Sequence, residues 1–398
     1  MKKTFLNRLL VLSIILTTVS CSNDDGTTTT TVVPEVTNEV LGIEAVPSSL
    51  GSEYTTNFDR YTKVVTPNGG NIHIVAQNNL TNEQIVRCRS ILEHYLKNYE
   101  GSVYGSDKSA VANKMAENNA VLTLLNGQDD GTNPVNVNGQ ALFQNEIQVE
   151  GHSWYINQDY THRDAAFEEI LHFVHDNGIG VDGPNTQPGA APAFQAEIRA
   201  AQQNALSNQI WAVGDFVDII AEWTQENSLS QEYLASVIDS YYGLWGAWTG
   251  SSTHGMWGGY VAKDRNEIAN EDPQGAALMD NKFFHPYLTY NARIDTTFEG
   301  IFSLKFDQSI PYTNHSRYLK DITLLGAKNT NVRVNELDND ITGNEGVNTV
   351  LFSGNNSEYT ITTASGVTTV TDNTADRDGV NTLRSIEKAQ FSDQIINL

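Results

Sequence analysis

Basic residues are scarce in this sequence. It has 24 lysine and arginine residues against 48 aspartate and glutamate residues, which gives a formal net charge of -24. That charge repels phosphate backbones, so it argues against nucleic acid as a partner and makes divalent cations better ones. The charge alone shows no metal site, because an acidic surface also keeps a secreted protein soluble.

Long apolar runs are also few, and the most pronounced one lies near the N-terminus. It extends from Leu9 to Val19 behind a basic start and is too short to span a bilayer comfortably. This layout is typical of a secretory signal, and Ser20-Cys21 supplies the small residue and the cysteine that a lipoprotein signal peptidase needs. We therefore expect residues 1–20 to be a lipoprotein signal peptide and Cys21 to be the lipidated first residue of the mature protein. The alternative is an ordinary secretory peptide with a coincidental cysteine.

The sequence around Cys21 resembles a known group of lipoproteins. Thr18-Val19-Ser20-Cys21 is similar to the bacterial lipobox, with threonine where leucine is commoner, as in Bacteroidetes-type surface lipoproteins. The acidic residues that follow, Asp24 and Asp25, are similar to the signal that transfers those proteins to the outer face of the outer membrane. The resemblance implies a membrane anchor at Cys21 and an outer-membrane location facing the cell exterior.

Cysteine is nearly absent from the rest of the chain. Once Cys21 carries lipid, Cys88 has no partner for an intramolecular disulfide, so stability must come from a core or a bound metal. Cys88 lies on the apolar stripe of a helix that is predicted to begin at the capping box Thr81-Asn82-Glu83-Gln84. We expect an inert, packed thiol there.

Changes in composition divide the mature chain into three parts. Residues 21–45 are Thr-rich and lack the apolar side chains needed to fold alone, which predicts a disordered tether. Residues 46–305 combine helical periodicity with short strand patterns, among them 141–149 and 152–156 joined by a Glu150-Gly151 turn. Residues 306–398 carry short β-type runs separated by Asn/Gly turns. The expected fold class is α+β: a mainly helical domain with a small antiparallel sheet, followed by a small all-β module.

The segment from Thr161 to Gly178 carries the most informative pattern. We expect a helix with its N-cap at Thr161 or Asp164 and its C-terminus at Gly178. Beside its apolar stripe, one face places Glu168, His172 and His175 at the i, i+4, i+7 spacing, so that these side chains lie above one another. A carboxylate and an imidazole one turn apart can reach a single cation, and Glu169 points to the side, where a base could hold a metal-bound water.

This segment resembles a metallopeptidase motif. Glu168-Glu169-Ile170-Leu171-His172 is similar to the zincin helix His-Glu-x-x-His with its first position changed, and the segment from Glu232 to Asp239 looks like the Glu-aromatic-x-Ala-Glu segment of the anthrax lethal factor-like metallopeptidases. The resemblance implies a zincin-like domain in which Glu168, His172 and Glu232 bind the metal and Glu169 is the general base.

Two positions depart from the pattern of that family. Glu168 replaces its first histidine and Ser236 replaces the second glutamate of its other helix, while Asp239 could orient a ligand from behind. Two carboxylates and one imidazole make a harder, more anionic site than one with two histidines. Zinc is the first expectation, with manganese or iron as alternatives and His175 as a further candidate ligand. Candidate oxyanion donors are Tyr233, Tyr241, Tyr242, His254 and His285.

The C-terminal part carries a second resemblance. Ala375 to Asp393 is similar to the closing unit after haemolysin-type calcium repeats, which is also found at serralysin C-termini. The tandem Gly-Gly-x-Gly-x-Asp units that bind calcium are missing, so we expect no calcium-dependent roll. Calcium at Asp338, Asp340 or Asp378 stays an alternative, because turn-forming Asx residues explain the same letters without any ion.

Two functions follow from these patterns. The leading interpretation is a surface-anchored metallopeptidase that hydrolyses extracellular protein or peptide with metal-activated water. The alternative is a catalytically inactive metal- or glycan-binding surface protein on a peptidase-like scaffold, with Trp245, Trp248 and Trp257 as a glycan platform. Convergence of Glu168, His172 and Glu232 would favour the first interpretation, and an exposed row of tryptophans the second.

Overall fold

The computed structural model describes residues 40–181 and 189–398. The expected signal peptide, the lipidation of Cys21 and the tether up to residue 39 lie outside the described residues. The folded part begins before residue 45, where the tether was predicted to end, because Leu41 and Ile43 are buried and Glu44 exchanges backbone hydrogen bonds with Tyr61. Within the described ranges, no helix is long and apolar enough to cross a membrane.

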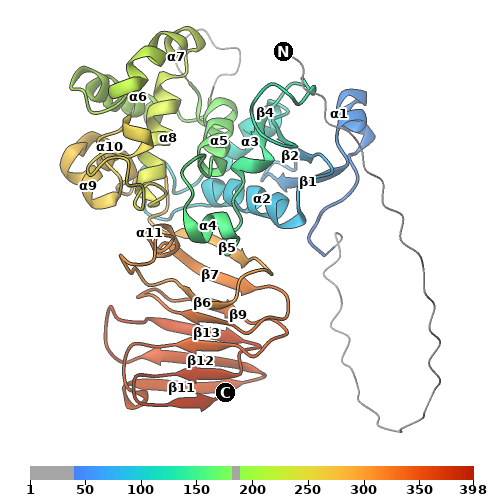
Figure 1. Ribbon diagram of the computed structural model, residues 1–398. Helices are drawn as coiled ribbons and strands as arrows, with labels where there is room; N and C mark the ends of the chain where they lie inside the picture. The colour runs from blue at the N-terminus through green and yellow to red at the C-terminus, as the bar shows by residue number, and fades with distance from the viewer. Residues whose placement is uncertain (1–39, 182–188) are drawn as a thin grey trace, which may run out of the picture. The chain divides into compact units, whose positions relative to one another are not determined.

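The first sheet is mixed, with the strand order β1-β2-β3-β4 (Figure 1). Its strands are β1 (Arg60–Val65), β2 (Asn71–Ala76), β3 (Val121–Leu125) and β4 (Gln140–Phe143). β1 and β2 form an antiparallel hairpin, whereas β2, β3 and β4 run parallel. The sequence predicted an antiparallel sheet. Helices α2 (Asn82–Leu96) and α3 (Ser109–Glu117) lie between β2 and β3 and provide the crossover that a parallel pair requires.

Residues 144–162 form turns and a short helix in place of the predicted hairpin at Glu150-Gly151. β4 ends at Phe143, and the 3₁₀ turn η2 (Gln144–Glu146) and helix α4 (Ser153–Asn157) follow it. Tyr155 of α4 is buried, with its ring 6.3 Å from that of Phe302. Packing of this ring therefore overrides the strand propensity of the segment.

Helix α5 (Ala166–Val174) lies in the core and packs against α2 and α8 (Leu229–Tyr241). It begins later than predicted, because Asp164 is held in a buried ion pair with Arg87 of α2 at 2.6 Å and Thr161 lies outside the helix. Its last turn continues into a π-type turn (His175–Ile179) that ends at Gly180, two residues beyond the predicted Gly178.

The remaining helices surround α8 or cover the sheets (Figure 1). Helices α6, α7, α9 and α10 all contact α8 and enclose its buried face. The bounds are α1 (Ser52–Asn57), α6 (Pro192–Ser207), α7 (Ile220–Glu226), α9 (Arg265–Glu271), α10 (Pro273–Met279) and α11 (Thr313–Ser316). Short 3₁₀ turns are η1 (Ser48–Leu50), η4 (Gly214–Ile219), η5 (Met256–Gly258) and η6 (Asn356–Glu358).

The C-terminal part consists of two sheets between which the chain alternates (Figure 1). One sheet has the order β11-β12-β13-β9-β7-β5 and the other β15-β14-β10-β8-β6. The central strands of each sheet are parallel, with β11–β12 and β15 added in antiparallel fashion. The bounds are β5 (Leu288–Ile294), β6 (Gly300–Ser303), β7 (Leu319–Leu324), β8 (Thr330–Arg333), β9 (Asp340–Thr342), β10 (Thr349–Leu351), β11 (Tyr359–Ala364), β12 (Val367–Asp372), β13 (Val380–Arg384), β14 (Lys388–Gln390) and β15 (Ile395–Asn397).

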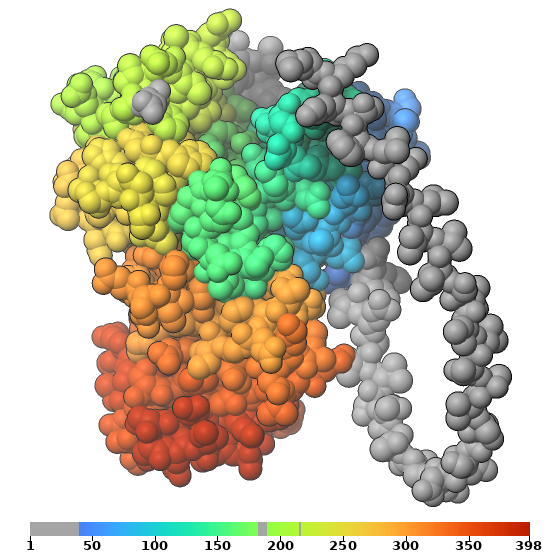
Figure 2. Space-filling model, in the orientation of Figure 1, coloured from blue at the N-terminus to red at the C-terminus, as the bar shows by residue number. Residues whose placement is uncertain are grey.

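The fold class is therefore α+β, as predicted, with a strand-rich C-terminal part. The two C-terminal sheets begin at Leu288. Residues 288–305 therefore belong to the same sheets as the module that was predicted to start at residue 306. Figure 2 shows the residues around α4 (green) lying directly against the first of these strands (orange). One hydrophobic core continues from the helices into the sheets, and it includes the buried Cys88, whose pKa is raised by that burial.

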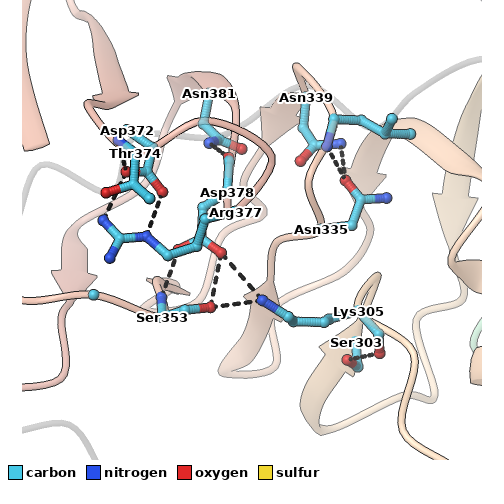
Figure 3. A network of polar contacts seen from close by, with 12 residues as sticks. Ser303, Lys305, Asn335, Asn339, Ser353, Asp372, Thr374, Arg377, Asp378 and Asn381 are labelled. Atoms are coloured by element: carbon cyan, nitrogen blue, oxygen red, sulfur yellow. Dashed lines mark hydrogen bonds and ion pairs between the residues drawn. The ribbon is translucent and has the colours of Figure 1, made fainter.

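Polar side chains join neighbouring turns of the C-terminal sheets (Figure 3). The amide groups of Asn335 and Asn339 donate to the carbonyl oxygens of Leu319 and Lys320 at 3.0 and 2.9 Å. These bonds satisfy backbone carbonyl groups at the start of β7, and satisfying backbone groups in this way is a role that turn-forming Asx residues commonly take.

The carboxylates considered for calcium all have protein partners. Asp378 is fully buried and accepts hydrogen bonds from the backbone N–H of Ser353 at 2.6 Å and the Tyr359 hydroxyl at 2.7 Å. The ammonium of Lys305 lies 3.5 Å from the same carboxylate (Figure 3). Asp338 accepts from the N–H of Val380 at 2.8 Å, and Asp340 pairs with Arg384.

Candidate metal centre

Two helices bring three potential ligands to one point. Glu168 and His172 lie one turn apart on α5 and are buried, with 3% and 9% of their surfaces exposed, and the half-buried Glu232 lies in the first turn of α8. One ligand atom from each of the three lies within 4.8 Å of the other two. In residues 40–181 and 189–398 these are the only three histidine, cysteine or acidic residues that come together in this way. These are the three residues that the sequence analysis proposed as metal ligands.

The donor set suits a divalent ion. Zinc binds nitrogen and oxygen ligands at about 2.0–2.2 Å, so donors around one tetrahedral ion lie roughly 3.5 Å apart. The observed separation of up to 4.8 Å is about 1.3 Å wider than that value, so the side chains would have to move together on binding an ion. Nε2 of His172 is buried and has no hydrogen-bond partner in the described part of the chain. A buried imidazole nitrogen without a partner is unusual, and a bound ion would account for it.

Burial sets the protonation of the imidazole. Burial, together with the neighbouring His175 and Arg163, lowers the pKa of His172 to about 3. His172 is therefore neutral at pH 7, which is the form that binds metal.

Burial also raises the pKa values of two acids, Glu232 of the cluster and Glu169 beside it. The pKa of Glu232 rises to about 7, although Arg163 opposes the shift. The pKa of Glu169 rises to about 8. Burial is the main cause, Arg163 opposes the rise, and the charges of Glu146 and Glu232 add to it. A cation in the cluster would favour the ionised forms of both acids, so protons would leave as the ion binds.

Glu169 is held beside the cluster by the edge of the first sheet. Its Oε2 atom accepts a hydrogen bond of 2.7 Å from Nε2 of Gln140, the first residue of β4. The same oxygen lies 3.9 Å from Nδ1 of His172. The predicted base is thus oriented by a β4 side chain and lies next to a predicted ligand, outside the group of three.

Arg163 is the residue that the sequence analysis did not foresee. Its guanidinium pairs with the carboxylate of Glu168 and lies 3.1 Å from Oδ2 of Asp239. It also lies over the ring of Trp257, 5.7 Å from the centroid. Asp239, which was expected to orient a ligand from behind, is linked to Glu168 through Arg163. Burial raises the pKa of Asp239 to about 7, and Arg163 opposes that shift.

His175 is not in the group of three. It is fully buried, and its Nε2 atom lies 2.5 Å from Oε1 of Gln195 on α6. The amide nitrogen of Gln195 in turn donates to the Ser230 hydroxyl at 3.0 Å. The helical spacing that put His175 on the ligand face assumed regular α-helix, but a π-type turn begins at this residue.

The tryptophans do not form an exposed row. Trp245 is 1% exposed and Trp257 is 41% exposed, and their rings meet edge to face at 5.0 Å. Two of the candidate oxyanion donors also have structural partners. The Tyr233 hydroxyl donates to the buried Asp272 at 2.7 Å, and the Tyr242 hydroxyl donates to the backbone of His285 at 2.7 Å.

The local sequence offered one signal for the missed residues. Two basic residues, His162 and Arg163, lie between the expected N-cap residues Thr161 and Asp164. Arg163 shortly precedes the adjacent glutamates Glu168 and Glu169 of the helix, with which a basic side chain could pair. Its pairing with Asp239 links residues 76 positions apart and could not be read from spacing. Comparisons with protein-family models, with curated proteins and with solved structures find no match to this chain.

Proposed function

We propose that this protein is a metal-dependent peptidase, in which Glu168, His172 and Glu232 hold one divalent ion and Glu169 is the general base. The observation that carries the proposal is the approach of three potential ligand atoms, from two helices, to within 4.8 Å of one another beside a further carboxylate, that of Glu169. Zinc fits this set, and the two carboxylates also suit manganese or iron.

A divalent ion held by three protein ligands supplies Lewis acidity and an acidified water. The chain's own groups would do the rest. The Glu169 carboxylate, oriented by Gln140 at 2.7 Å, would take a proton from the attacking water and deliver it to the leaving amine. Arg163 would hold the Glu168 carboxylate in place and offset its charge.

The proposed substrate is extracellular protein or peptide, because the expected signal and Cys21 imply an exported, lipid-anchored protein on the outer membrane. A second candidate is a metal-binding surface protein without hydrolysis. One observation favours it: Arg163 already supplies a positive charge to Glu168 within the cluster.

Peptide hydrolysis separates these two candidates. The protein from residue 40 onward, reconstituted with zinc or manganese, is expected to cleave a denatured protein such as casein and to lose that activity with a chelator. Glu169→Gln should retain the metal but lose at least about 100-fold in rate, since it removes a general base. Glu271→Gln, on the exposed end of α9, is the control and should remain active. Metal binding without any hydrolysis would contradict the peptidase and leave the second candidate.

A further inference from the structure

An exposed tryptophan lies beside the candidate metal centre. Of the six tryptophans, all of which lie in the described ranges, Trp257 alone is exposed, with 41% of its surface accessible. The guanidinium of Arg163 lies over its ring, 5.7 Å from the centroid, and the same guanidinium pairs with the carboxylate of Glu168. Because an ion pair brings the two charged groups into hydrogen-bond contact, the ring centroid lies within roughly 10 Å of the Glu168 carboxylate.

The backbone that carries this ring is strained. Met256 and Trp257 both have φ 48°, in the left-handed region that bulky side chains rarely adopt. The turn is closed by the backbone N–H of Gly255, which donates to the carbonyl oxygen of Tyr260 at 2.8 Å. Strain of this kind persists only where the surrounding structure enforces it, and it clusters at active sites and in ligand-binding loops.

The two strained residues have opposite environments. Met256 is 4% exposed, and the hydroxyl of Ser236 donates to its Sδ atom at 2.8 Å. Ser236 lies one turn after Glu232 on α8. The turn is therefore fixed to the helix that carries a candidate ligand, while the next side chain along the chain, that of Trp257, stays exposed to solvent.

The contacts of the Trp257 ring define what its exposed surface can bind. Its Nε1 atom donates to the carbonyl oxygen of Tyr160 at 3.1 Å, and the ring of Trp245 meets it edge to face at 5.0 Å. Nε1 is the only polar atom of the side chain, so the exposed remainder is an apolar aromatic surface. Such a surface suits another aromatic ring. A basic side chain is disfavoured, because Arg163 already lies over the ring as a cation.

We propose that Trp257 determines the specificity of the proposed peptidase by binding an aromatic side chain of the substrate, two or three residues from the scissile bond. An extended peptide advances about 3.3 Å per residue, so a side chain at that separation from a bond held at the metal reaches the ring. The inference rests on the proposed function and names the substrate class of that site.

Peptide binding tests the role of Trp257 separately from hydrolysis. The host is Glu169→Gln with zinc, in which a bound peptide is not consumed. The probes are blocked heptapeptides of glycine and alanine that carry one phenylalanine, or one lysine, at successive positions. We expect phenylalanine at one position to tighten binding, measured by calorimetry, about tenfold over the parent peptide. Trp257→Ala and Trp257→Asn in this host should each remove that gain, and asparagine tolerates the left-handed backbone.

An exposed aromatic residue elsewhere provides the matched control. Phe306, in the C-terminal part, is 45% exposed and lies 4.6 Å from the guanidinium of Arg317, so Phe306→Ala removes a similarly placed ring and should keep the phenylalanine gain. Thermal unfolding of both Trp257 variants should stay within a few degrees of the wild type. In the zinc-loaded wild type, kcat/KM for the best phenylalanine peptide should exceed that for the parent, and Trp257→Ala should lower this ratio about tenfold.

The outcomes separate this inference from the proposed function. A lack of any phenylalanine gain, a gain that survives both Trp257 variants, or lysine peptides that bind as tightly would overturn the role of Trp257, even if the wild type cleaves peptides. A gain that depends on Trp257, in a protein whose wild type cleaves none of the peptides, would support the aromatic site and contradict the peptidase.

Discussion

Arg163 compensates charge at the candidate metal centre. Its guanidinium contacts two buried carboxylates, those of Glu168 and Asp239. Where the zincin motif that the sequence resembles has a histidine, this chain has Glu168, which adds a negative charge to a buried site. A carboxylate at this position is tolerable only with a cation nearby, and Arg163 provides one.

Arg163→Met should therefore destabilise the metal-free protein. We expect a loss of about 3 kcal/mol in the free energy of unfolding, because two buried carboxylates lose their cation. Added zinc should restore part of the loss, since the ion replaces the missing charge. Chemical denaturation with and without zinc measures both effects. Arg333→Met, at an exposed position, is the control and should change stability by less than about 0.5 kcal/mol. An unchanged stability of Arg163→Met would contradict the role given to Arg163.

Lys108 carries a second buried charge, far from these carboxylates in the sequence. It is 1% exposed, and its ammonium donates to the carbonyl oxygen of Tyr95 at 2.9 Å and lies 4.3 Å from the centroid of the Phe283 ring. Burial lowers the pKa of Lys108 from 10.5 to about 7. The unfolded chain therefore binds more protons than the folded protein between pH 7 and 10.5.

This shift predicts a pH-dependent effect of Lys108→Met. Below pH 7 both states carry the charge and the cost of burying it is fully present, so the variant should be more stable than the wild type. The difference should shrink by about 2 kcal/mol between pH 6 and pH 9, as the wild type gains stability. Urea unfolding of both proteins at the two pH values measures it. A difference that is constant with pH would show that Lys108 titrates normally.

At the scale of elements, the sequence predicted those that local patterns determine. The capping box at Thr81 and Gln84 begins α2, with both reciprocal bonds present. The i, i+4 spacing of Glu168 and His172 holds because α5 is regular over those residues. Local pattern did not predict the π-type turn that begins at His175, and it was wrong for the Glu150-Gly151 hairpin, where tertiary packing of Tyr155 decides.

The turns of the C-terminal sheets also illustrate this limit. The Asp and Asn residues there suggested either calcium or turn chemistry, and their partners are distant in sequence. Asp378 contacts Ser353 and Tyr359, which lie 25 and 19 positions away. Only the pairing of successive strands, which no local pattern specifies, brings these groups together.

Asp378→Asn tests the stabilising role of this buried carboxylate. The new side-chain NH2 group would face a donor, the Ser353 N–H or the Tyr359 hydroxyl, where a carboxylate oxygen now accepts. We therefore expect a loss of about 2 kcal/mol in the free energy of unfolding. Thermal or urea unfolding measures the loss, and neither calcium nor a calcium chelator should change the wild-type result. The exposed Asp376, already in the left-handed region at φ 56°, is the matched control as Asp376→Asn. A calcium-dependent rise in wild-type stability would instead place an ion among these carboxylates.

At the scale of the whole molecule, the helices and the C-terminal sheets share one core. Buried side chains continue from α5 and α8 into β5 and β7 without a break. The sequence predicted the α+β class and the strand-rich C-terminal part from composition. It did not predict the parallel order of the first sheet, because strand order depends on crossover helices that bury against distant residues.

The candidate metal centre also depends on this long-range packing, because Glu232 reaches Glu168 and His172 only when α8 packs against α5. The most direct test is the metal content of the protein from residue 40 onward, measured by mass spectrometry after incubation with zinc, manganese or iron and removal of free ion. We expect close to one ion per chain, lost in His172→Ala and in Glu232→Ala and retained in Glu222→Ala at an exposed position of α7. A wild-type protein that binds none of the three metals, or binds them equally in all variants, would contradict the metal centre.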